Sequence, residues 1–384
     1  MDAATLQYLR KLFRNYYERN AGSLLLPPDF SSREFAAQLW GMKSYIRHLA
    51  FKSRQSFEDW VREKAPRHLY YSSAVYVMPG AQNMDEKGWV GADLIFDIDA
   101  DHLPACQGKI VEIRNEAKGL KTSIAPDECL DAAAWEAVKL VDVLRHELGF
   151  SDSSIRVEFS GHRGFHVIVS CKGFEECFTA DSTVRKEILD YIRGEMYDAS
   201  LLEFTPETRG RRRVKIYPIP PRVSDPGLRG RIARIAVLLA RREGEEMVIK
   251  ALSAPPLDAS RLYKRHRDVI ESYLSKAMEE IRVDVDPQVT LDTKRLIRVP
   301  YSLHGKSGLV VKPLDASKLV SSDWNLVMFS PFTRLDSIKV RLLVDVKDVK
   351  IFGHKLRLSA GNEYRLPAPI AIYLMSKEIA VLSR

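Results

Sequence analysis

The chain has 384 residues, with 59 Lys and Arg against 51 Asp and Glu, so its formal net charge is +8. Hydrophobic residues make up 45% and charged residues 29%, a balance that allows a sizeable core and excludes a disordered chain. No apolar run comes near the roughly 20 residues of a membrane span, and the first residues carry no leader pattern. Four cysteines in a chain of this length make no disulfide framework. Membrane, secreted and fibrous classes are therefore excluded, a reducing cytoplasm is favoured, and the basic excess fits a phosphate-rich partner.

The first part of the chain interleaves helical and strand patterns. Apolar residues at helical spacing and β-rich runs of alternating polarity distinguish the two. The predicted helices are residues 4–20, a segment beginning near 31–35, and 130–147, after a polar loop at 101–127. The predicted strands are 71–77, 92–99, 154–159 and 166–170. This interspersion predicts a mixed α/β core.

The middle of the chain has a different, mainly helical pattern. Helices are expected over 181–199, 230–242 and 257–280, with a Pro- and Arg-rich connector at 205–229. Strand-like runs return at 285–312 and 337–357, before a closing helix at 366–383. We therefore expect a catalytic core built from residues 1–178 and 281–384, with a mainly helical subdomain, 179–280, inserted into it or appended to it.

The sharpest chemical signal is the run LIFDID at residues 94–99. Successive side chains of a strand point to opposite faces, so Asp97 and Asp99 share a face, about 7 Å apart, and the apolar residues cover the other. Such a pair repels itself unless a cation or a base lies between its members, and Mg²⁺ binds through one or two carboxylates plus substrate phosphates. Two solvated aspartates on an edge strand are the alternative.

A second signal is SGHRGFH at residues 160–166, between two predicted strands. Its glycines permit a tight turn with exposed backbone N–H groups. Ser160, Arg163 and His166 add a hydroxyl, a guanidinium and an imidazole, which together could clamp a triphosphate. An ordinary hairpin with a Gly-rich turn is the alternative.

A third signal is VDVD at residues 283–286, followed by RLIRVPYSLHGKSG at 295–308. Arg298, His304 and Lys306 occupy polar positions of this stretch. Phosphoryl transfer depends mostly on positioning and charge neutralisation, so carboxylates, imidazoles and cations on short turns are its working parts. An amphipathic strand pair would explain this block alone, but the joint presence of the three blocks favours nucleotide chemistry.

Taken together, the three blocks resemble the catalytic small subunit of archaeal and eukaryotic DNA primases. Their order matches that family, and the resemblance includes SREF at 32–35 and YIRHL at 45–49, so it touches most of residues 30–312. The resemblance implies a mixed-sheet primase core. It also implies that two Mg²⁺ or Mn²⁺ ions are held by Asp97, Asp99 and Asp286, the last because DPQVT at 286–290 fits the family context.

The same resemblance assigns the nucleotide-binding residues. The implied phosphate binders are Ser160, Arg163 and His166, the later triphosphate and sugar contacts are Arg298 and His304, and a basic cluster near the incoming nucleotide is Arg33 and Arg47. The family also carries a zinc knuckle, which is degenerate here over residues 102–129. Cys106 and Cys129 with His102 are candidate zinc ligands, Asp127 or Glu128 being alternatives to the histidine, because Pro126 replaces one expected cysteine.

The implied function is a DNA-dependent RNA polymerase, a primase that makes short primers on single-stranded DNA for replication from nucleoside triphosphates. The resemblance further implies a heterodimer with a large subunit and a cytoplasmic location in an archaeal-type cell. Three alternatives stay open: a primase-polymerase that extends chains with deoxynucleotides in repair, a two-metal phosphoesterase or nuclease, and a non-catalytic nucleic-acid-binding subunit. A basic run before the prolines at 218–221 is either a template-strand contact or a solvated face: Arg209, Arg211, Arg212, Arg213 and Lys215.

Overall fold

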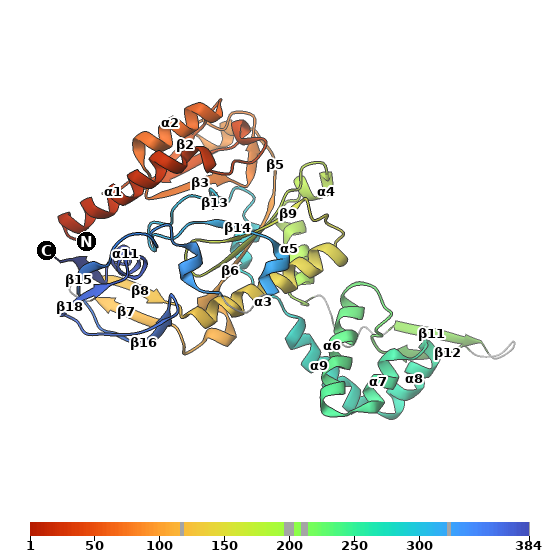
Figure 1. Cartoon of the computed structure of the whole chain (residues 1–384). Coiled ribbons are helices and arrows are strands. Elements are labelled where there is room, and N and C mark those ends of the chain that lie inside the picture. The colour runs from red at the N-terminus through yellow and green to blue at the C-terminus, as the bar shows by residue number, and fades with distance from the viewer. Residues whose placement is uncertain (116–118, 196–202, 209–213, 321–323, 384) are drawn as a thin grey trace. The chain divides into compact units, whose positions relative to one another are not determined.

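The structure is a computed structural model of the whole chain, and it describes residues 1–115, 119–195, 203–208, 214–320 and 324–383. The chain folds into two compact units. Unit 1 comprises Met1–Val138, Asp152–Thr183 and Val285–Arg384, and unit 2 comprises Lys139–Ser151 and Val184–Asp284. Helices and antiparallel strands are interspersed in unit 1, whereas unit 2 is mainly helical (Figure 1), which confirms the predicted α/β class.

Unit 1 begins with the predicted amphipathic helix, α1 (Ala3–Asn20), which buries Leu9 and Phe13. The second predicted helix, near residues 31–35, is wrong. The chain makes a short 3₁₀ turn at Phe30–Ser32 and enters strand β1 (Phe35–Gln38) instead. The first three residues of β1 are fully buried because β2 and β3 pair with it on both sides, and such a continuous apolar run suits a central strand.

Two sheets of unit 1 position the site. The first has the strand order β13-β3-β1-β2, and the second has the order β14-β9-β10-β6. The first sheet contains β1, β2 (Ile46–Leu49), β3 (His68–Ser72) and β13 (Leu296–Arg298). The second contains β6 (Leu94–Asp99), β9 (Ile155–Phe159), β10 (Gly164–Val169) and β14 (Lys312–Leu314). In the second sheet Asp97 lies opposite His166, and His166 lies opposite Glu158, so three polar side chains cross the sheet in one row.

Smaller elements complete unit 1. Its helices are α2 (Arg54–Lys64), α3 (Asp127–His146, of which residues up to Val138 belong to unit 1), α4 (Glu175–Phe178), α10 (Pro287–Leu291) and α11 (Ala368–Ser376). Its hairpins are β4 (Ala74–Tyr76) with β5 (Trp89–Ala92), β7 (Val111–Asn115) with β8 (Leu120–Ile124), and β16 (Val346–Ile351) with β17 (His354–Leu358). A further sheet has the order β18 (Glu363–Leu366), β15 (Ile338–Leu342), β19 (Ala380–Leu382). The expected closing helix therefore ends at Ser376 and gives way to a strand.

Unit 2 packs its helices around an apolar cluster that includes Ile232, Val248 and Ile270. Its helices are α5 (Ser182–Ile192), α6 (Gly227–Glu243), α7 (Glu246–Ser253), α8 (Pro256–Arg265) and α9 (Arg267–Ile281), and strand β11 (Glu203–Thr208) pairs with β12 (Val214–Ile219). The basic run that begins at Arg209 lies outside the described residues, and so does the side chain of Lys215.

The cysteines correct one expectation from the sequence. Cys106 is paired with Cys129, and Cys171 with Cys177, as disulfides. All four residues are buried, and their Cα atoms lie 5.7 and 5.3 Å apart, because the fold brings together positions whose spacing in the sequence follows no recognised pattern. No described helix combines the length and the apolar character needed to cross a membrane.

Candidate active site

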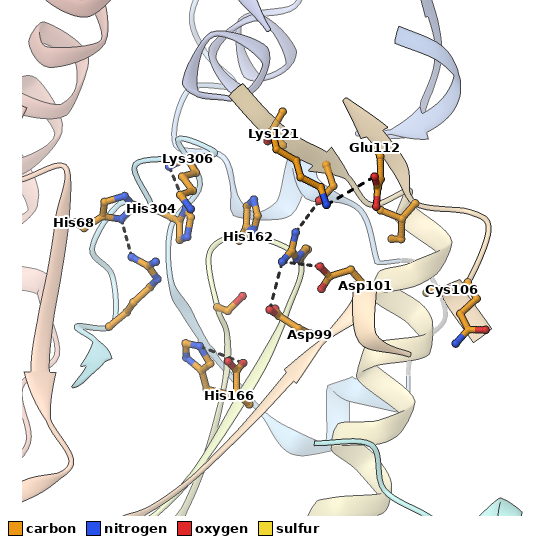
Figure 2. A pocket seen from close by; sticks show the side chains of 18 of the residues that line it. His68, Asp99, Asp101, Cys106, Glu112, Lys121, His162, His166, His304 and Lys306 are labelled. Atoms are coloured by element: carbon orange, nitrogen blue, oxygen red, sulfur yellow. Dashed lines mark hydrogen bonds and ion pairs between the residues drawn. The ribbon is translucent and has the colours of Figure 1, made fainter. Parts of the chain in front are cut away.

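A pocket of about 840 Å³ opens in unit 1 where β6 ends and β10 begins (Figure 2). Many of the predicted site residues line it: Asp97, Asp99, Ser160, Arg163, His166, Arg298 and His304. The structure adds residues that were not predicted as site residues, notably Tyr45, His68, Asp101, His162 and Lys306. Segments more than 200 residues apart in the sequence thus meet in one cavity.

The carboxylates come from strand β6, as its alternation predicts. Asp97 and Asp99 line the pocket, while Phe96 and Ile98 point the other way and are fully buried. Burial raises the pKa of Asp97 to about 6, with neighbouring carboxylates adding to the rise and the His166 and Arg295 charges opposing it. Its Oδ1 atom is buried and has no hydrogen-bond partner among the described residues. This oxygen is therefore available to a ligand.

His166 lies between two carboxylates. Its Nδ1 is 3.2 Å from Glu158 Oε1, and its Nε2 is 3.7 Å from Asp97 Oδ1. Burial lowers the pKa of His166, but the Glu158 hydrogen bond and the charge of Asp97 outweigh that effect and leave the pKa raised. Glu158 was missed from the sequence, although it lies on β9 only two residues before Ser160. It is fully buried and fixes the imidazole from behind.

The turn after β9 depends on its glycines. Gly161 has φ +83°, a backbone conformation that favours glycine. A Cβ at Gly164 would lie 1.9 Å from the carbonyl oxygen of Ile98, so β10 can approach β6 this closely only because residue 164 has no side chain. The Ser160 hydroxyl is buried and has no hydrogen-bond partner among the described residues. It is thus a second unsatisfied polar group at the pocket wall.

Arg163 links this turn to the acidic side of the pocket. Its guanidinium donates to Ser123 Oγ at 2.8 Å and pairs with Asp101 at 2.8 Å and Asp99 at 3.6 Å. The side chain is one-fifth exposed, so it remains open to an anion. A phosphate that entered would meet a guanidinium already held in place by carboxylates.

Three imidazoles form the opposite wall, and in Figure 2 His68, His304 and His162 follow one another from the left. His162 and His304 are stacked at 4.8 Å, and His68 meets His304 edge-on at 5.1 Å. His68 Nδ1 accepts from Arg298 at 2.8 Å, and His304 Nδ1 accepts from the Lys306 backbone N–H at 3.2 Å. His68 and His304 therefore carry their protons on Nε2.

Electrostatics keep these rings neutral. Burial, followed by the nearby cations, sets the pKa of His68, His162 and His304 well below the usual range. Neutral imidazoles with one nitrogen already engaged offer N–H donors, and the permanent positive charge comes from Arg298, whose guanidinium lies 4.7 Å over the Tyr70 ring. A donor wall thus faces an acidic wall across the pocket.

Asp286 lies beside the carboxylates, although it is not among the residues that line the pocket. It caps helix α10 by accepting from the Gln288 N–H at 2.9 Å, and its own N–H donates to the Asp97 carbonyl at 2.9 Å. Its charge contributes to the raised pKa of Asp97. The structure therefore places Asp286 next to Asp97, and its role as a metal ligand stays a prediction.

Arg33 and Arg47 are not among the lining residues. Arg33 is 2% exposed and fully engaged, because it pairs with Asp29 at 2.7 Å and Asp93 at 2.8 Å and donates to backbone carbonyls. Arg47 pairs with the buried Glu34 at 2.9 Å. Neither side chain lines the pocket in this structure. The contacts of Arg33 indicate that it stabilises the fold by joining Asp29 to Asp93.

The candidate zinc ligands do not come together as a set. Cys106 and Cys129 are joined to each other by a disulfide, and His102 is exposed. No group of three or more His, Cys, Asp or Glu side chains that could hold a metal ion occurs in the described parts of the chain. A zinc ion would require both sulfurs in the reduced form, so zinc binding stays a prediction.

Comparison with known proteins identifies the family. The DNA primase small subunit PriS of Hyperthermus butylicus is 46% identical over 382 residues, which cover 99% of this chain and 97% of that protein. The chain belongs to the DNA primase small subunit family. The family's sequence model matches residues 96–316, and the PriS protein of Aeropyrum pernix is 33% identical over 96% of this chain and 91% of its own. The polymerase domain of Mycobacterium tuberculosis ligase D, solved in complex with DNA, aligns with 81% of this chain and 82% of its own at 13% identity, with a TM-score of 0.34.

Proposed function

We propose that this chain is the catalytic subunit of a DNA primase, which joins nucleoside triphosphates into short primers on single-stranded DNA for replication. The observation that carries this proposal is the division of one pocket into an acidic wall and a donor wall. Asp99 and Asp101 lie on one side of the pocket, and the imidazoles of His68, His304 and His162 lie on the other (Figure 2). Nucleotidyl transfer needs both sides at once, whereas hydrolysis of a phosphodiester has less need of a triphosphate clamp.

The acidic wall fits the divalent ions that the family implies. Carboxylate oxygens suit Mg²⁺ and Mn²⁺, and the buried Asp97 Oδ1 has no hydrogen-bond partner among the described residues. Asp97, Asp99 and Asp286 would hold the ions, and substrate phosphate oxygens would have to complete the coordination. When bound there, such ions lower the pKa of an attacking hydroxyl and neutralise a departing pyrophosphate.

The chain's own residues bind and orient the substrate. The Ser160 hydroxyl and the Arg163 guanidinium would take phosphate oxygens, and the neutral His304 would donate a hydrogen bond from Nε2. Glu158 holds the imidazole of His166 at a fixed angle, so that its Nε2 proton points toward Asp97 and the reacting phosphate. No covalent intermediate on the protein is required.

Partners follow from what one pocket can hold. Starting a chain requires two nucleotides at once, and the pocket offers one donor wall for a triphosphate. We therefore propose that a large subunit completes the initiation site in a heterodimer, with single-stranded DNA as template. Work on chromosomal DNA would place the complex in the cytoplasm of an archaeal-type cell.

Synthesis on an unprimed template tests the proposal. Labelled nucleoside triphosphates, single-stranded circular DNA and Mg²⁺ or Mn²⁺ are incubated with the wild type and with Asp99→Asn. We expect short new chains from the wild type and a loss of about 100-fold or more in the variant. Asp59→Asn, which removes a 60% exposed carboxylate on α2, is the matched control and should leave synthesis unchanged. Extension of supplied primers only, or degradation of the template, would refute the assignment.

A further inference from the structure

Lys377, directly after helix α11, lies behind the donor wall of the pocket. It is 3% exposed, and its Nζ lies 2.8 Å from His162 Nε2 and 2.8 Å from the Ser123 carbonyl oxygen. The nitrogen also lies 4.9 Å from the centre of the Tyr373 ring. Within the described residues Lys377 forms no ion pair with a carboxylate, which is unusual for a buried lysine. Lys87, which is also buried, differs from Lys377 because it does pair with a carboxylate, that of Glu34.

The contacts of Lys377 determine which nitrogen of His162 carries the proton. A lysine Nζ has donors in either charge state, and one of them goes to the Ser123 carbonyl. When Lys377 is an ammonium it has no acceptor, so it donates to His162 Nε2 and the proton of this imidazole is on Nδ1. His162 in turn stacks on His304 with an interplanar angle of 7°. Lys377 therefore fixes one ring directly and the next ring through it.

The surroundings of Lys377 are predominantly positive. The titratable and charged groups that face it are His162 and Arg163 on the turn after β9, Lys306 on the 303–308 turn, Tyr373 on α11 and Asp101 after β6. Burial, followed by the charges of Arg163 and Lys306, lowers the pKa of Lys377 well below its usual range, and Asp101 opposes this only in part. A polyanion in the pocket would reverse the balance of charge and favour the ammonium form.

We propose that Lys377 is a positioning residue for the nucleotide triphosphate, which holds the stacked pair His162 and His304 in place and takes up a proton when the triphosphate binds. This inference rests on the proposed function, because it assumes that the pocket receives a triphosphate. The step is a protonation alone: the amine of Lys377 gains a proton from buffer, and no covalent bond of the protein or nucleotide changes.

Calorimetry with a nucleotide tests the proposal. Binding of α,β-methylene-ATP with Mg²⁺ is measured at several pH values in two buffers that differ in ionisation enthalpy, which gives the number of protons taken up. The wild type should take up a fraction of a proton, at most about one, in the pH range between the free and bound pKa values of Lys377. Lys377→Met should abolish that uptake and weaken binding about tenfold, whereas Lys377→Arg should restore affinity without proton uptake, because arginine stays charged.

A double-mutant cycle separates positioning from a merely structural role. If Lys377 acts through His162, then Lys377→Met combined with His162→Gln should weaken binding no more than about twofold beyond the weaker single variant. Lys87→Met removes a buried lysine away from the pocket and should leave proton uptake unchanged. Thermal unfolding identifies any variant that does not fold, and the variants that do fold still test whether Lys377 positions His162.

The outcomes distinguish this inference from the proposed function. If the wild type binds no nucleotide, both fail. Wild-type binding with the same proton uptake in Lys377→Met would overturn the role of Lys377 and leave the proposed function intact. Fully additive losses in the double variant would likewise refute the positioning role.

Discussion

Asp97→Asn should stabilise the fold above pH 6 while it abolishes activity. The pKa of Asp97 rises from 3.8 to about 6 in the folded chain, so folding favours the protonated carboxyl. The native state therefore loses stability as pH rises from about 4 to 6, because the carboxyl of the unfolded chain ionises first while burial opposes the charge in the folded chain. One pKa unit corresponds to about 1.4 kcal/mol, and the rise corresponds to about 3 kcal/mol. Asparagine removes this penalty, so the variant should be about 3 kcal/mol more stable at pH 8 and about equal in stability below pH 4.

Urea unfolding followed by tryptophan fluorescence measures this difference. Every tryptophan of the chain lies in unit 1, where the site is: Trp40, Trp60, Trp89, Trp135 and Trp324. Asp101→Asn is the control, since it breaks a 2.8 Å pair with Arg163 and should destabilise the fold by about 1 kcal/mol. An Asp97→Asn variant less stable than the wild type at pH 8 would refute the reasoning, and so would a difference that does not change with pH.

Three further outcomes follow from the contacts. Glu158→Gln should lower the pKa of His166, because it removes the charged hydrogen-bond acceptor that raises it, and the imidazole will lose its proton at a lower pH in an NMR titration. Arg33→Met should destabilise unit 1 by about 3 to 5 kcal/mol, since it leaves Asp29 and Asp93 without their buried partner. The KM for nucleotides should stay unchanged in this variant, and a raised KM would show that Arg33 contributes to nucleotide binding. Ser160→Ala should raise that KM about tenfold with a smaller effect on kcat, and steady-state kinetics in which KM does not change would exclude the hydroxyl from binding.

The acidic wall could be predicted from sequence because it is local. Alternation along one strand places Asp97 and Asp99 on the same face, and two glycines make the turn that presents Ser160 and Arg163. Patterns of this kind depend on neighbouring residues, and the fold preserves them.

His68 and His162 could not be predicted as members of the donor wall, because they meet the rest of the site only in three dimensions. His68 is held by Arg298, 230 positions along the chain, and His162 by Lys377, 215 positions along it. The protonation state of each ring depends on burial and on these partners, which periodicity does not reveal. The buried pairing of Arg33 could not be predicted for the same reason, since nothing in its neighbourhood in the sequence indicates that its guanidinium pairs with Asp93.

The most direct test is a crystal structure of the chain with Mn²⁺ and α,β-methylene-ATP, in which the ion is located by its anomalous scattering. We predict anomalous density beside the carboxylates of Asp97 and Asp99, with phosphate oxygens within hydrogen-bond distance of the Ser160 hydroxyl and the Arg163 guanidinium. Density for the ion away from β6, or a triphosphate that avoids the Ser160 turn, would contradict the assignment of this pocket as the site of primer synthesis.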